Sequence, residues 1–202
     1  MWASTLHGVK KKIFSPEIVF DGVTLSINAN EKQGCYEVIL RRTHEQIQAM
    51  LSHHCKVFVF MVMFHSNDYS PINRLFSNFM RKFKKKLAAK LGLKRMGYVW
   101  VRERDERAAQ HYHLALFLDG NKVQRSHNIF KLCVEIWEGW NQPRPSFPGG
   151  RSFYMLRRGD EGTYREAFRH ISYLAKVWTK GGRPSSTNDY YSSQIKPRAE
   201  GR

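Results

Sequence analysis

The sequence predicts a single α+β domain built on a twisted, mainly antiparallel sheet of about five strands, with helices packed largely on one face. The first indication is Val57–Phe64, where all eight positions are apolar, as in a strand covered on both sides. The second is a pair of strand-like runs, Gly97–Glu103 and His111–Leu118, separated by a short charged loop. The third is a helical spacing of apolar residues after Pro71. With 202 residues, of which 42% are apolar, the chain can bury a core of its own.

The N-terminal part predicts short strands and one helix. Residues 1–16 indicate a basic arm, and strands are expected at 18–20 and 23–27 around an Asp21-Gly22 turn. A further strand is expected at 36–40. Thr43 and Gln46 have the spacing of a capping box, which predicts that a helix begins there.

The middle of the chain predicts a basic amphipathic helix and a hairpin. The helix runs from Pro71, which suits a first turn, to Gly92, which suits a stop. Gly97–Glu103 and His111–Leu118 form the hairpin, and Ser126 can cap the next helix. The apolar positions of the helix between Pro71 and Gly92 are Ile72, Leu75, Phe76, Phe79, Phe83 and Leu87.

The C-terminal part predicts a loop at 141–150, a strand at 152–156 and a last helix at about 164–178. Residues 181–202 are rich in Gly, Ser, Pro and Asn and indicate a mobile basic tail. The folded domain is therefore expected to span residues 17–180.

The charge balance indicates a polyanionic partner. Lys and Arg number 34 against 17 Asp and Glu, a formal net charge of +17. Such a surface attracts nucleic acid or an anionic membrane. No apolar run approaches the roughly 20 residues that span a bilayer, and the N-terminus lacks a signal-peptide pattern. We therefore expect a cytoplasmic protein without a membrane partner, whose three cysteines are reduced, buried thiols.

His111-Tyr112-His113 is the sharpest local feature. Strand alternation places both imidazoles on one sheet face, about 7 Å apart along the backbone. Glu103 becomes a third ligand if the hairpin pairs it with His111, and a shift in register would present Asp105 or Glu106 instead. Two imidazoles and one carboxylate leave coordination positions open, which suits Mg²⁺ or Mn²⁺ bound together with a phosphate oxygen.

Tyr173 and Lys176 are three residues apart on the predicted last helix and are expected to be neighbours on its surface. A phenol beside an ammonium group is suited to attack a phosphodiester, because the cation favours the phenolate and balances charge on the phosphorane. The other interpretation is an ordinary amphipathic helix with a half-buried tyrosine and a solvated lysine.

Three segments together resemble the filamentous-phage (inovirus) gene-two-like replication proteins, also known as the YagK/YfjJ C-terminal family of the HUH endonuclease superfamily. The segments are Tyr98-Val99-Trp100-Val101-Arg102-Glu103-Arg104, His111-Tyr112-His113-Leu114-Ala115-Leu116-Phe117-Leu118-Asp119-Gly120, and Ser172-Tyr173-Leu174-Ala175-Lys176 with Thr179-Lys180. The resemblance runs from about residue 45 to 180.

The resemblance implies a metal-dependent nuclease that cuts single-stranded or hairpin DNA at an origin of rolling-circle replication in a bacterial cell. It implies His111, His113 and an acidic residue as metal ligands, Tyr173 as the nucleophile and Lys176 as its partner. The expected product is a 5′-phosphotyrosine with a free 3′-hydroxyl. Candidate contacts to the DNA strand are Lys82, Lys85, Arg102 and Lys180.

Several alternatives remain open at this point. The same chemistry would serve a plasmid-mobilising relaxase or a single-strand transposase, and recruitment of a host helicase is undecided. A regulator that binds single strands without cutting them, or an RNA-binding domain, could have the same fold. Tyr190-Tyr191 resembles a pair of nucleophilic tyrosines, but we assign it to the tail.

Overall fold

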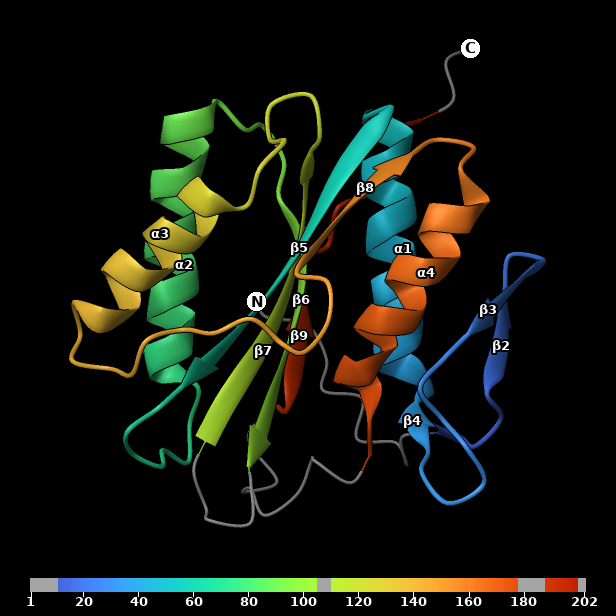
Figure 1. Ribbon diagram of the computed structural model, residues 1–202, viewed down its shortest axis with the longest axis horizontal. Helices are drawn as coiled ribbons and strands as arrows, with labels where there is room; N and C mark the ends of the chain where they lie inside the picture. The colour runs from blue at the N-terminus through green and yellow to red at the C-terminus, as the bar shows by residue number, and fades with distance from the viewer. Residues whose placement is uncertain (1–10, 105–109, 178–187, 200–202) are drawn as a thin grey trace.

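The computed structural model describes residues 11–104, 110–177 and 188–199. In these residues a five-stranded antiparallel sheet has the spatial order β8, β5, β7, β6, β9. Four helices flank it, two on each side (Figure 1). This architecture confirms the predicted α+β class. The strands are β5 (Lys56–His65), β6 (Gly97–Arg104), β7 (Gln110–Asp119), β8 (Phe153–Arg157) and β9 (Tyr190–Ser192).

The core has two halves, one on each side of the sheet. We call the side covered by α1 (Glu37–His53) and α4 (Glu161–Ile171) the first face, and the side covered by α2 (Arg74–Leu91) and α3 (His127–Glu138) the second face. We expected the helices largely on one face, and they are instead divided between both. The apolar run of β5 accounts for this, because it presents apolar side chains to both sides.

Helix α1 begins earlier than predicted. Residues 37–40, expected in a strand, form its first turn, and β4 is confined to Cys35–Tyr36, paired with β1 (Lys12–Ile13). Thr43 lies inside the helix and its hydroxyl donates to the carbonyl of Ile39. The capping-box prediction is therefore wrong, because apolar residues such as Ile39 and Leu40 already belong to the buried helix face.

The predicted Asp21-Gly22 turn and the predicted end of a helix at Gly92 are both confirmed, and both require residues with positive φ. Asp21 (φ 49°) and Gly22 (φ 78°) join β2 (Glu17–Phe20) to β3 (Val23–Ser26). Gly92 ends α2 in the left-handed conformation, with φ 60°.

The predicted tail contains an ordered strand. β9 pairs with β6, with Tyr191 opposite Trp100 and Tyr190 opposite Val101. The Ser193 hydroxyl donates to the Gln46 side chain in the interior. The prediction of a mobile tail is wrong for this stretch, because strand pairing along β6 fixes its position.

Two further expectations are tested by the fold. Across the described residues, none of the helices combines the length and apolar character needed to cross a bilayer. Cys35, Cys55 and Cys133 are free thiols, and Cys35 and Cys133 are buried as expected. Cys55 is exposed, because it lies in the connection between α1 and β5.

Candidate metal and phosphate-transfer site

Three potential metal ligands meet at one end of the hairpin. Strands β6 and β7 pair in the predicted register, which places Glu103 directly opposite His111. One carboxylate oxygen, Oε2 of Glu103, lies 3.3 Å from Nε2 of His111 and 3.2 Å from Nε2 of His113. The ligand atoms of the three residues all lie within 4.8 Å of one another. The cluster is on the first face of the sheet, because His113 alternates with Tyr112, which belongs to the core of the second face.

This cluster fits a divalent cation. Glu103 is only 2% exposed, and a buried carboxylate needs compensating positive charge or hydrogen bonds. Within the described part of the chain, the buried Nδ1 atoms of His111 and His113 have no hydrogen-bond partner. Two imidazoles and a carboxylate can hold Mg²⁺ or Mn²⁺ and leave coordination positions open. Glu103, His111 and His113 could therefore hold a metal ion.

Tyr173 and Lys176 lie beside this cluster. The Tyr173 ring centre is 5.8 Å from the ring centre of His113, and Nζ of Lys176 is 3.6 Å from the Tyr173 ring centre. The predicted continuous helix is wrong here. Helix α4 ends at Ile171 and the chain continues as the 3₁₀ helix η1 (Ser172–Ala175). Tyr173 lies within η1, and Lys176 is the residue that follows it.

The loop after β3 fixes this end of the helix. The Ser172 hydroxyl donates to the Arg169 carbonyl and accepts from the backbone N–H of Asn28, at 2.6 and 2.8 Å. The side-chain amide of Asn28 also donates to the Arg169 carbonyl. Beyond η1, the backbone N–H of Val177 donates to the carbonyl of Gly34. Tyr173 thus sits on a segment that is held on one side by side-chain hydrogen bonds at Asn28 and Ser172 and on the other by a backbone hydrogen bond to Gly34.

The environment holds the phenol in its neutral form. Burial, and then the negative charge of Glu103, raise the pKa of Tyr173 above its usual value. Burial lowers the pKa of Lys176, while Cys35 and Glu103 act in the opposite direction. The same carboxylate therefore acts on both groups, and a cation bound to Glu103 would remove its unfavourable effect on the phenolate.

A cavity of about 730 Å³ on the first face opens beside Tyr173 and His113. One wall comes from β5 and β8, and the other from α4 and the loop at 148–151. Arg169 supplies positive charge to it, and Arg151 lies 3.3 Å from the carboxylate of Glu166, which also lines the cavity. Met61, Met63 and Tyr154 supply apolar surface. Such a lining suits a nucleotide, which combines a flat apolar base with a phosphate.

Comparison with known proteins identifies the family. Residues 22–143 match the profile of the YagK/YfjJ C-terminal domain. The chain belongs to the YagK/YfjJ C-terminal domain family. No curated protein and no solved structure matches the chain. In this YagK/YfjJ domain the matched residues include Glu103, His111 and His113 and end before Tyr173 and Lys176.

The predicted DNA contacts do not gather around this site of the YagK/YfjJ domain. Lys82 and Lys85 are exposed on α2, the helix that covers the second face of the sheet. Arg102 is 4% exposed and donates to the carbonyl of Ser70, so its guanidinium is directed toward the segment before α2. Lys180 lies outside the described residues, as do the alternative acidic ligands Asp105 and Glu106.

Two features of the site could not be predicted from the sequence. His65 pairs with His111 across β5 and β7, and their ring centres are 5.7 Å apart. A histidine at the end of a buried strand is a weak signal, because its partner is known only once the register of β5 is known. The lining of the cavity, including Arg151 and His170, comes from segments far apart in sequence and carries no local pattern.

Proposed function

We propose that this protein is a metal-dependent endonuclease and strand transferase acting on single-stranded DNA. In this proposal it nicks a replication origin through Tyr173 and so initiates rolling-circle replication in a bacterial cell, as an inovirus gene-two-like member of the HUH superfamily. The observation that carries the proposal is the position of the Tyr173 ring, whose centre is 5.8 Å from that of the His113 imidazole and 3.6 Å from the Lys176 ammonium nitrogen.

The residues divide the chemistry between them. Glu103, His111 and His113 would hold Mg²⁺ or Mn²⁺, which when bound polarises a non-bridging phosphate oxygen. Lys176 contributes a positive charge beside the ring of the nucleophile and beside charge that builds on the phosphate. Arg151 and Arg169 supply countercharge for the strand along the cavity.

The covalent step is a balanced exchange of one phosphodiester for another. The Tyr173 oxygen forms a bond to phosphorus as its phenolic proton is lost to solvent, and the bond between phosphorus and the 3′-oxygen breaks. The leaving 3′-oxygen takes up a proton and becomes a free 3′-hydroxyl, while the 5′-phosphate stays on Tyr173. The reverse attack by a 3′-hydroxyl rejoins the strand and releases the tyrosine.

A denaturing gel tests this proposal. Purified protein is mixed with end-labelled single-stranded oligonucleotides, in the presence of Mn²⁺ or of a chelator. The oligonucleotides tile the intergenic region of the phage or mobile genetic element that would encode the protein. Wild type is expected to give a covalent adduct that requires the metal and vanishes in Tyr173→Phe. Tyr154→Phe is the matched control, because it removes another phenol of the same cavity.

Two outcomes would reject the proposal. Cleavage that persists in Tyr173→Phe would remove the assigned nucleophile. Tight binding of single strands without any adduct would instead support a regulator that binds DNA but does not cut it.

A further inference from the structure

A second cavity, of about 610 Å³, lies on the second face, between α2 and the β6–β9 edge of the sheet. We call it the aromatic groove and define it by Tyr98, Trp100 and Tyr191 on the strands and by Arg81 and Lys84 on α2. The metal cluster is on the first face, so the sheet separates the two sites. Nothing in the proposed cutting chemistry uses this groove.

Tyr191 is an exposed ring held in place by buried rings. It is 36% exposed, whereas Tyr98 and Trp100 are 7% and 6% exposed. Its ring centre lies 6.3 Å from each of theirs, with interplanar angles of 30° and 29°. The backbone pairing of β9 with Trp100 fixes the position from which this ring projects. An immobilised, partly exposed ring is what a nucleobase needs for stacking, since little side-chain freedom is lost on binding.

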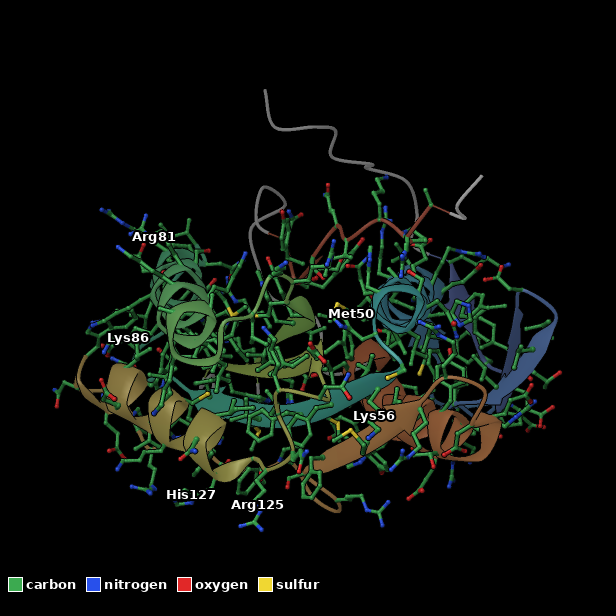
Figure 2. All side chains as sticks on the ribbon, turned by 90° about the horizontal axis from the view of Figure 1, so that it is seen from above. Met50, Lys56, Arg81, Lys86, Arg125 and His127 are labelled. Atoms are coloured by element: carbon green, nitrogen blue, oxygen red, sulfur yellow. The ribbon has the colours of Figure 1, made fainter. Side chains whose placement is uncertain are left out.

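The other wall of the aromatic groove is cationic. Nζ of Lys84 lies 5.2 Å from the Tyr98 ring centre. Arg81 extends from α2 away from the sheet (Figure 2). Helix α2 contains several Lys and Arg but no Asp or Glu, and the described lining of the groove contains no carboxylate. The charge of this wall is therefore not cancelled locally and complements a phosphate backbone.

We propose that the aromatic groove binds a single strand of DNA, with a base stacked on Tyr191 and phosphates placed against Arg81 and Lys84. Duplex DNA fits this arrangement poorly, because its bases are already stacked on each other and unavailable to Tyr191. The groove would hold a strand on the face opposite the metal cluster. This inference does not rest on the proposed cutting activity.

The test is fluorescence anisotropy on the full chain with chelator present, using a labelled oligo-dT, the equivalent oligo-rU and a labelled DNA duplex. Tyr191→Leu is expected to weaken oligo-dT binding roughly 5- to 150-fold, the range for loss of one stacked base. Tyr191→Phe is expected to retain the affinity, because it keeps the ring. Lys84→Gln is expected to lower the salt dependence of log K by about 0.7, the value for one phosphate contact on a single strand.

Matched controls separate a local effect from a general one. Phe153→Leu removes another exposed ring that stacks on a buried ring at the other edge strand, β8. Lys90→Gln removes one charge from α2 outside the groove. Both are expected to change oligo-dT binding less than twofold.

Three results would overturn the inference. In the first, Tyr191→Leu binds oligo-dT as wild type does. In the second, it loses duplex binding to the same extent, which would indicate phosphate contacts without stacking. In the third, only oligo-rU binding is lost, which would assign the groove to RNA. The adduct assay with Tyr173→Phe reports separately on cutting, so failure of one proposal is distinguishable from failure of the other.

Discussion

The ammonium nitrogen of Lys176 lies 3.6 Å from the centre of the Tyr173 ring, and the same tyrosine ring lies beside the imidazole of His113. This is a contact with the ring face rather than with the hydroxyl, so the cation acts on the phenol through its field. The contact depends on the change from α4 to η1, because Lys176 follows η1 directly.

We therefore predict that Lys176→Met slows formation of the covalent adduct by about 10²- to 10³-fold, the usual effect of removing one group that stabilises transition-state charge. Lys176→Arg should recover part of the rate, since it keeps the charge. The measurement is single-turnover adduct formation, with strand affinity measured in parallel. Lys122→Met, an exposed lysine at the far end of the hairpin, is the control. An unchanged rate in Lys176→Met would show that the contact has no catalytic role.

A second prediction concerns metal binding. Glu103→Gln keeps the shape of the side chain but removes the charge that the two imidazoles share. We expect the affinity of this variant for Mn²⁺ to fall by about 10- to 100-fold or more. A loss of that size already follows when a residue that is hydrogen-bonded to a metal ligand is replaced. Titration calorimetry measures this directly. Saturating Mn²⁺ should raise the melting temperature of wild type and not of Glu103→Gln.

The control for metal binding is Glu166→Gln, because Glu166 is an exposed carboxylate of α4 that faces the neighbouring cavity. Equal Mn²⁺ affinity in Glu103→Gln and wild type would contradict the assignment of this cluster. The melting temperature of each variant without metal shows whether the substitution has altered the fold.

Features set by local pattern were predictable from the sequence. The unbroken apolar run identified β5, and alternation along the strand placed His111 and His113 on one face. Glu103 was expected beside them only in one register of the hairpin, and β6 and β7 pair in that register. These inferences need only the two-residue period of a strand and the pairing of a hairpin. The Gly92 stop likewise needs only a residue that tolerates positive φ.

Features set by contacts between distant segments were not predictable. β9 has the composition of a tail, and only its pairing with β6 makes it a strand. The end of α4 at Ile171 depends on hydrogen bonds from Asn28, more than a hundred residues earlier. The prediction that Tyr173 and Lys176 are neighbours holds, but the spacing alone could not indicate the 3₁₀ geometry that brings them together.

A third prediction tests how the C-terminal segment is held. The Ser193 hydroxyl donates to Oε1 of Gln46 and accepts from the backbone N–H of Tyr98, at 2.6 and 2.9 Å, in the interior. Ser193→Ala leaves the Tyr98 N–H buried without that partner, while Oε1 of Gln46 still accepts from the backbone N–H of Ile195. The unsatisfied N–H costs about 1–3 kcal/mol. Denaturant unfolding of the two proteins measures the loss. Ser26→Ala, at an exposed position of β3, should change the free energy of unfolding by less than about 0.5 kcal/mol.

The last prediction concerns the pH dependence of stability. His170 lines the cavity beside Tyr173, and its Nε2 donates to the Gly149 carbonyl while its Nδ1 accepts from the Tyr154 hydroxyl. Burial lowers the pKa of His170 below its usual 6.5.

As pH falls below 6.5, the unfolded chain takes up a proton at His170 before the folded protein does, so the contribution of this histidine to stability is complete above pH 6.5. It is lost as pH falls toward the folded-state pKa. We expect His170→Gln to be less stable than wild type at pH 8 and to lose less stability between pH 7 and pH 5.

Urea unfolding from pH 5 to pH 8 measures both effects, with exposed His127→Gln as the control. His54, whose pKa is also lowered by burial, remains in every variant and should keep some acid sensitivity in His170→Gln. Parallel pH profiles for wild type and His170→Gln would mean that the proton uptake of His170 does not differ between the folded and unfolded states.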